Sequence, residues 1–157
     1  MHLKKIFVLL LLISFNFSAF ADSFKSDDIL GFWLSEKKTA VVEISKIKNK
    51  FMGKIVWLKD IHDGKIKNKF DDKNPKKELQ KRSLMGLEML YGFVFTSGEW
   101  KDGKIYDPES GKTYSAKMKL ESAKKLDLRG YVGIPMFGRS SSWEKQKTAV
   151  PDNYSQP

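Results

Sequence analysis

The chain has no cysteine among its 157 residues and only two histidines, His2 and His62. Disulfides, thiol catalysis, dithiol redox chemistry and cysteine-ligated metal centres are therefore excluded. A histidine next to an aspartate, as in His62-Asp63, can serve as a base or a metal ligand. Because His2 falls in the leader segment described below, a metal site around His62 would have to draw its other ligands from carboxylates. Stability has to come from packing.

Long apolar runs are also missing, apart from a short one near the N-terminus. Lys4 and Lys5 precede an apolar run at 6–13, and Ala19-Phe20-Ala21 supplies small residues at the spacing of a cleavage site. A transmembrane helix would need about 18 uninterrupted apolar residues. We therefore expect a signal peptide over residues 1–21, cleaved after Ala21, and a soluble exported protein with no transmembrane segment.

The remaining 136 residues correspond to one domain with a basic surface. Removal of the leader takes away Lys4 and Lys5 and no acid, so the formal charge falls from +10 to +8. We expect a single β-barrel domain over 22–147 and a flexible C-terminal tail over 148–157. Such a surface favours contact with anionic lipid, glycan or nucleic acid, and it is equally typical of an ordinary soluble basic protein.

Alternation of apolar and polar residues with a period of two predicts strands through most of this domain, and helical periodicity is nearly absent. The alternation is clearest at 113–120, where Tyr114, Ala116, Met118 and Leu120 share one face. Further strands are expected at 31–35, 39–46, 51–59, 85–96, 99–101, 104–106, 126–132 and 137–145. About eight short antiparallel strands with tight links predict an all-β meander barrel, with a sandwich as the second choice.

Two connections need separate treatment. Asp102-Gly103 has the composition of a two-residue hairpin turn, because such turns need positive φ values. Residues 60–83 form a long polar segment, which predicts a flap or binding loop. Within it, Asn74-Pro75 could cap a short helix that runs to Gln80.

The segment GKIYDPESGKTY contains the most obvious acid/base candidates, Asp107 and Glu109. General acid/base catalysis needs a carboxyl group that is desolvated, so that its pKa rises. The residues Asp107 to Gly111 also have the composition of a solvated turn, with Asp as acceptor, Pro to fix φ and Gly for positive φ. We interpret the segment as a hairpin tip and assign no catalytic residue.

Other candidate sites also lack the pattern that their chemistry needs. Asp63, Asp71, Asp72 and Asn74 offer oxygen ligands without the spacing of a calcium loop, so no metal or cofactor is assigned. The serines at 140–142 belong to no nucleophile elbow. Lysines interleaved with aromatic residues near Trp57 suggest single-strand nucleic-acid binding, but export argues against that partner.

The aromatic residues are better explained as inward-facing. A small barrel is either filled by its side chains or keeps room for one small ligand, and composition alone does not separate the two. For a ligand cavity we predict a wall made of Trp57, Tyr91, Phe93, Tyr114 and Met118.

Several short motifs together resemble a known bacterial family. They are Gly31-Phe32-Trp33, Gly53-Lys54-Ile55-Val56-Trp57, Asp72-Lys73-Asn74-Pro75, Gly86-Leu87, the stretch from Gly103 to Tyr114, Arg129-Gly130-Tyr131, and Gly138-Arg139 through Trp143. The set is similar to the exported proteins of the domain of unknown function 2147 family. That resemblance implies a lipocalin-like (calycin) barrel in the bacterial envelope, in the periplasm or secreted, with no established activity.

The same resemblance implies a structural pair. Gly31-Phe32-Trp33 is similar to the opening motif of lipocalins, in which the tryptophan closes one barrel end against an arginine of the last strand. Here Trp33 and Arg139 would form that pair, through a cation–π contact.

Three functions follow as hypotheses. The first is a non-enzymatic protein that binds a small apolar or amphiphilic ligand, with residues 60–83 as a flap over one barrel end. The second is an envelope interaction protein whose basic face docks on anionic lipid, glycan or a protein partner. An enzyme that uses Asp107 and Glu109, or His62, is the third.

Overall fold

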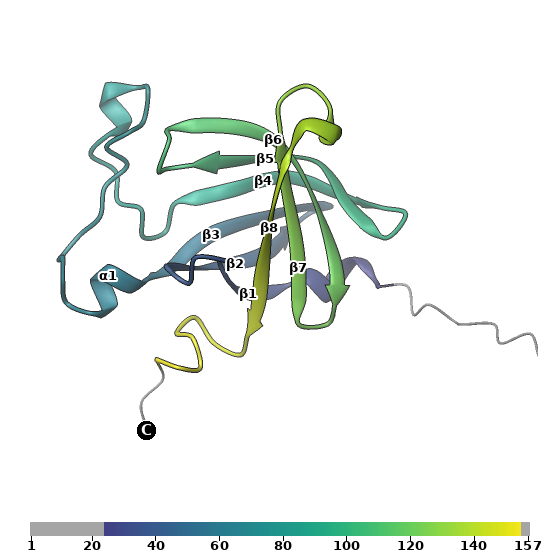
Figure 1. The fold of residues 1–157 in the computed structure, drawn as a ribbon, viewed down its shortest axis with the longest axis horizontal. Helices are drawn as coiled ribbons and strands as arrows, with labels where there is room; N and C mark the ends of the chain where they lie inside the picture. The colour runs from purple at the N-terminus through teal and green to yellow at the C-terminus, as the bar shows by residue number, and fades with distance from the viewer. Residues whose placement is uncertain (1–23, 155–157) are drawn as a thin grey trace, which may run out of the picture.

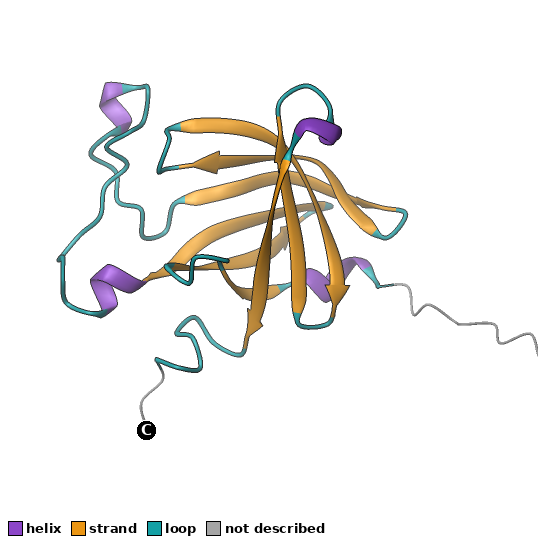
Figure 2. Cartoon of the chain, viewed as in Figure 1, coloured by secondary structure: helices purple, strands orange, loops and turns teal. Residues whose placement is uncertain are grey.

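The chain forms a closed antiparallel barrel whose eight strands pair in the order of the sequence, with β8 returning to β1. A computed structural model describes residues 24–154, and Figure 1 shows the barrel with its long β3–β4 connection extending to one side. Strands account for most of the cartoon in Figure 2. The predicted all-β meander barrel is confirmed. The predicted signal peptide, residues 1–21, and the last three residues of the predicted tail lie outside the described residues.

The strands are β1 (Gly31–Leu34), β2 (Ala40–Ile47), β3 (Lys50–Leu58), β4 (Glu88–Thr96), β5 (Glu99–Asp107), β6 (Lys112–Ser122), β7 (Lys125–Tyr131) and β8 (Arg139–Gln146). The helical turns are η1 (Ser26–Ile29), α1 (Lys59–His62), η2 (Lys77–Leu79) and η3 (Pro135–Phe137). No helix among residues 24–154 is long and apolar enough to cross a membrane.

Alternation places the inward face of β6 where the sequence predicts it. In β6, Ala116, Met118 and Leu120 are buried, whereas Lys119 is exposed. Below the open end of the barrel, the interior is filled by large apolar and aromatic side chains that pack against one another. These are Trp33, Phe51, Leu90, Phe93 and Trp100. The barrel is therefore solid at the end where η1 covers it.

The hairpin predicted at Asp102-Gly103 is wrong. Thr96 pairs directly with Glu99, so the β4–β5 turn is Ser97-Gly98, and both turn residues have positive φ. Asp102 also has positive φ, at 59°, but it lies inside β5 at a shift of the β5–β6 register. The same backbone preference serves a β-bulge there.

The predicted closure of Trp33 by Arg139 is also wrong. The β1–β8 register pairs Trp33 with Lys145, whose Nζ lies 4.5 Å from the Trp33 ring centroid. Lys145 Nζ also donates to the carbonyl of Leu30, and Trp33 Nε1 donates to Ile29 O at 2.7 Å. Burial lowers the pKa of Lys145, partly offset by Asp28. Arg139 begins β8 at the opposite end and is exposed.

The C-terminal segment packs on the barrel up to Tyr154 and is no free tail over that range. Val150 and Tyr154 pack against a second cluster on the outer face, formed by Leu34, Val41 and Trp57. The rings of Trp57 and Tyr154 lie 5.1 Å apart between centroids. The segment therefore covers apolar residues that β1 to β3 would otherwise expose.

Candidate functional site

One cavity, here called the mouth, opens at the barrel end opposite η1 and has a volume of about 400 Å³. Its inner part is apolar, because Val42, Ile55 and Trp143 point into the barrel above the solid core. Leu58, Leu84 and Met89 form the wall, and Phe70 contributes from the flap. The rim is charged and carries Glu36, Lys37, Lys69, Asp72, Lys73, Asp107 and Glu109. An apolar floor below a charged rim suits a ligand with one apolar end.

One ion pair spans the rim between two loops. Lys37 Nζ of the β1–β2 loop lies 2.5 Å from Glu109 Oε2 of the β5–β6 turn, and the hydrogen bond that Lys37 donates to Glu109 raises the pKa of Lys37. Both side chains are more than half exposed. Solvent screening makes such a pair a weak link, worth at most about 1 kcal/mol.

A buried polar network fixes the flap, residues 60–83, to the outer face of the barrel. Asp71 is fully buried and accepts hydrogen bonds from Tyr106 Oη at 2.5 Å, from Asn74 Nδ2 at 2.8 Å and from Arg82 Nε at 2.8 Å. Asn74 Nδ2 also donates to Tyr106 Oη at 3.0 Å. Burial, and then the bond to Asp71, raises the pKa of Tyr106. The charge on Asp71 is compensated by Arg82, so the network is suited to holding the flap.

The predicted short helix after Asn74 is reduced to a single turn, η2 at Lys77–Leu79. Asn74 Oδ1 accepts from the backbone N–H of Lys76, and Gln80 Nε2 donates to Asn74 O. Because the amide group of Asn74 also bonds to Asp71, the residue serves the network and the turn together.

The β5–β6 hairpin tip confirms the turn interpretation of the segment around Asp107. The carboxylate of Asp107 accepts hydrogen bonds from Glu109 N at 3.0 Å and from Ser110 Oγ at 2.6 Å. Gly111 has a φ of +70°, and a Cβ there would lie 1.9 Å from the carbonyl oxygen of Lys73. The tip and the flap therefore fit against each other only because residue 111 has no side chain.

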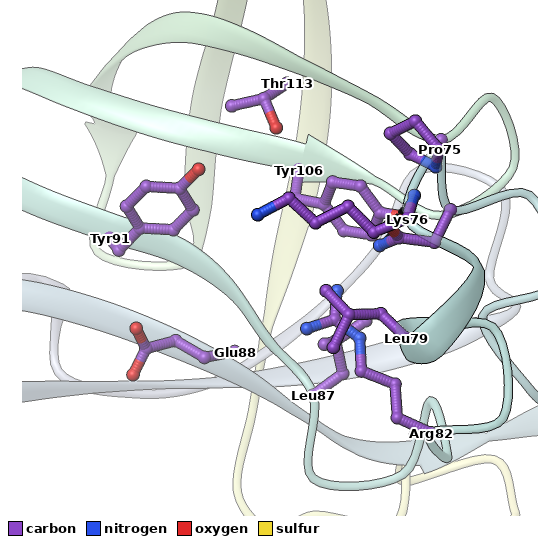
Figure 3. Close-up of a pocket in the computed structure, with 11 residues that line it drawn as sticks. Pro75, Lys76, Leu79, Arg82, Leu87, Glu88, Tyr91, Tyr106 and Thr113 are labelled. Carbon is purple, nitrogen blue, oxygen red and sulfur yellow. Dashed lines mark hydrogen bonds between the residues drawn. The ribbon is translucent and has the colours of Figure 1, made fainter.

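A second hollow lies on the outer face, between the flap and strands β4 to β6, with a volume of about 480 Å³. Figure 3 shows Lys76 and Arg82 reaching from the flap side toward Tyr91 and Thr113 on the strands. Tyr106 forms part of its floor. The lining of this hollow includes both basic and acidic side chains, and its arginine, Arg82, is already paired with Asp71.

The five predicted wall residues are not gathered around one cavity. Phe93 and Met118 belong to the solid core, and Trp57 faces outward beneath the C-terminal segment. Tyr91 lines the outer hollow, and Tyr114 is half-buried on β6 without lining either cavity. Positive φ at Gly92, with a shift of the β3–β4 register, puts Tyr91 and Phe93 on opposite faces.

The side chains that do line the mouth were identified in the sequence only in part. The alternation at 39–46 indicates that Ala40 and Val42 point inward, and both line the cavity. The same periodicity, applied to β3, predicts that Ile55 also points inward. Trp143 and Met89 depend on strand register and bulges that the sequence does not show.

Of the other sequence candidates, Asp72 and Ser141 line the mouth, whereas His62 and Asp63 lie apart from it. His62 packs against Trp57 and Tyr154 on the outer face. Asp63 Oδ2 lies 2.8 Å from Lys59 Nζ, which lowers the pKa of Asp63. Within residues 24–154 no group of three His, Asp or Glu side chains could hold a metal ion.

Known proteins resemble this barrel. Protein HP1028 from the human pathogen Helicobacter pylori, described as belonging to the lipocalin family, has a similar solved structure. The two share 23% sequence identity with a TM-score of 0.67, over 75% of this chain and 82% of the other. At that identity the likeness shows a lipocalin-like fold and no ligand. No curated protein matches the chain. The family described as "Uncharacterized protein conserved in bacteria (DUF2147)" matches residues 31–145, so the chain belongs to the DUF2147 family.

Proposed function

We propose that the protein is an exported, non-enzymatic binding protein that takes one small apolar or amphiphilic ligand into the barrel mouth. The observation that carries the proposal is the cavity of about 400 Å³, with Val42, Ile55 and Trp143 as its apolar floor. Pockets for small ligands are typically apolar, with a few polar groups that orient the ligand. An eight-stranded barrel is just wide enough to hold one such molecule.

The rim supports an amphiphile over a purely apolar molecule. Lys69 and Lys73 of the flap face the same opening as Asp72 and Asp107. A ligand whose polar head stays at this level keeps its hydration while its apolar part replaces water on the floor. Each buried methylene group then contributes about 0.8 kcal/mol.

The state of the carboxylates supports a non-enzymatic role. Asp107 is occupied by the turn that it organises, and Glu109 is exposed and paired with Lys37. Neither carboxyl group is desolvated as a general acid would need to be. His62 lies on the outer face and lines neither cavity.

Docking by the basic face of the flap gains less support, because some of its lysines are close to acids of the same segment. Lys65 Nζ lies 3.5 Å from Asp63 Oδ2, and Lys69 Nζ lies 3.8 Å from Asp60 Oδ2. These pairs reduce the excess of positive charge that would attract an anionic partner.

A cavity-filling pair of variants tests the binding site. Met89 is half-buried and lines the mouth, whereas Met85 lies four residues away, exposed and outside the lining. Anilinonaphthalene sulfonate, with dodecanoate as a competitor, serves as an amphiphilic probe. Met89→Trp should weaken its binding by about tenfold or more, which is about 1.4 kcal/mol, because the larger ring occupies the ligand volume. Met85→Trp should bind as the wild type does.

Equal binding by the two variants would refute a ligand site in the mouth. Organic extraction of the purified protein, followed by mass spectrometry, should release an apolar or amphiphilic molecule that Met89→Trp does not retain. Export is tested separately by cell fractionation and by the mass of the mature N-terminus. Retention of residues 1–21 in the cytoplasmic fraction would contradict it.

A further inference from the structure

The loop between β7 and β8 exposes an unusual concentration of apolar side chains. Among residues 132–138, here called the apolar tip, Val132 is 75% exposed, Ile134 52%, Met136 76% and Phe137 77%. The other large exposed hydrophobic residues of the described chain are scattered singly: Ile47, Ile66, Phe70, Met85 and Val94. Scattered residues of this kind are ordinary, whereas a contiguous apolar patch marks an interaction surface.

The apolar tip is held in a fixed conformation and does not fold back on the barrel. Arg129 Nε donates to Pro135 O at 2.7 Å, and Arg129 Nη2 donates to Met136 O at 3.2 Å. A Cβ at Gly138 would lie 2.6 Å from the carbonyl oxygen of Gly130, so a glycine is needed where the loop rejoins β8. In Figure 1 the tip projects beyond the ends of β7 and β8, with η3 at its outer side. The backbone conformation of the loop therefore keeps these apolar side chains exposed.

The charged residues that directly flank the tip are both positive, and the nearest acid, Asp127, reaches Arg129 through the hydroxyl group of Ser140. Arg129 and Arg139 flank it, and no acidic residue occurs between Asp127 and Glu144. Among the described residues Arg139 has no ion pair, and Arg129 bonds only to carbonyl and hydroxyl oxygens. Apolar side chains that project past a basic collar match the interface of a bilayer, where acyl chains lie beneath phosphate groups.

We propose that the apolar tip inserts into the surface of bilayers that contain anionic phospholipid. Phe137 and Met136 enter the boundary between head groups and acyl chains, and Arg139 stays at the level of the phosphates. The tip lines neither cavity, so this contact is independent of ligand binding in the mouth. Anionic lipid is favoured over a protein partner because the patch combines a narrow apolar tip with flanking arginines, of which Arg139 has no ion pair among the described residues.

Vesicle flotation tests the proposal. The protein is purified as expressing cells produce it, and mass spectrometry identifies its N-terminal residue. The vesicles are phosphatidylcholine, with or without phosphatidylglycerol. The variant Met136→Ser/Phe137→Ser should bind the anionic vesicles at least about tenfold more weakly, since each large apolar side chain accounts for a factor of that order. Ile47→Ser, which removes an exposed apolar residue elsewhere, should bind like the wild type.

A fluorescent variant gives a second readout that does not depend on affinity. The four native tryptophans, Trp33, Trp57, Trp100 and Trp143, are all buried. In Phe137→Trp an added tryptophan sits at an exposed position, and its emission should shift to the blue and be quenched by brominated lipid when anionic vesicles are added. The native background should stay constant.

Three results would overturn the proposal. One is unchanged flotation of the double serine variant, and another is equal binding to vesicles with and without phosphatidylglycerol. The third is the absence of vesicle binding combined with a wild-type dimer that the double variant converts to a monomer, which would assign the tip to a second copy of the chain. Probe binding in the mouth should be the same in the double variant and the wild type.

Discussion

The substitution Tyr106→Phe tests whether the Asp71 network holds the flap. The phenol is almost fully buried, donates to Asp71 Oδ1 at 2.5 Å and accepts from Asn74 Nδ2 at 3.0 Å. A hydrogen bond to a charged acceptor contributes about 1.5–3 kcal/mol. Asp71 keeps its bonds from Asn74 and Arg82 in the variant, so we expect a loss of about 2 kcal/mol in the free energy of unfolding.

The pH dependence of this loss distinguishes the hydrogen bond from simple packing. The pKa of Tyr106 is raised in the folded protein, by burial and by the bond to Asp71. Above the ordinary tyrosine pKa of about 10 the unfolded chain releases a proton that the folded chain still holds. The stabilisation by Tyr106 is therefore complete below pH 10 and declines as the pH rises through the folded pKa. The difference between Tyr106→Phe and wild type should shrink in that range.

Chemical denaturation at neutral and alkaline pH measures the difference, and hydrogen exchange locates it. The amides of residues 69–84 should exchange faster in Tyr106→Phe, while those of β6 and β7 stay protected. Tyr131 is half-buried and makes no hydrogen bond through its hydroxyl among the described residues, so Tyr131→Phe is the matched control. If the two variants agree within about 0.5 kcal/mol, the network does not fix the flap and the reasoning fails.

Two further substitutions test the closure of the two barrel ends. Gly111→Ala should lower the free energy of unfolding by about 1–3 kcal/mol, which is more than the loss in Gly98→Ala. Both positions need positive φ, but only residue 111 faces the Lys73 carbonyl. Equal losses in thermal unfolding would show that the contact with the flap adds nothing. Lys145→Met should lower the free energy of unfolding by about 1–2 kcal/mol, because it removes the contacts of the ammonium group with the Leu30 carbonyl and the Trp33 ring. Arg139→Met should change that free energy by no more than about 0.5 kcal/mol. A larger loss at Arg139 would restore the pairing first predicted for Trp33.

The sequence predicts the barrel because alternation and short links are local properties. It fails where two distant segments decide the outcome. The positive φ at Asp102 suits a turn or a bulge equally, and the bulge is favoured by packing of the Phe93 ring over Gly103, where a Cβ would lie 2.3 Å from the ring. Likewise Trp33 and Lys145 meet through a register between the first and last strands.

The candidate site was less predictable for the same reason. Strand alternation identifies which residues face inward, but it does not tell which of them end in a solid core and which border open space. Met118 is inward and fully packed, whereas Val42 is inward and lines the mouth. The flap network has no local signature, because Tyr106 lies 35 residues from Asp71 in the chain.

The energies of the contacts around the mouth indicate how a ligand would reach the floor under the proposed function. Lifting the flap would expose Asp71 and break the two hydrogen bonds that join the flap to Tyr106 of β5, of which the bond to the Asp71 carboxylate is worth about 1.5–3 kcal/mol. Separating the β1–β2 loop from the β5–β6 turn breaks only the exposed pair of Lys37 and Glu109, at about 1 kcal/mol or less. The easier route therefore runs between these two loops, while the flap stays in place as a preformed wall. Because a preformed wall needs no ordering when the ligand binds, less of the binding free energy is lost to conformational entropy.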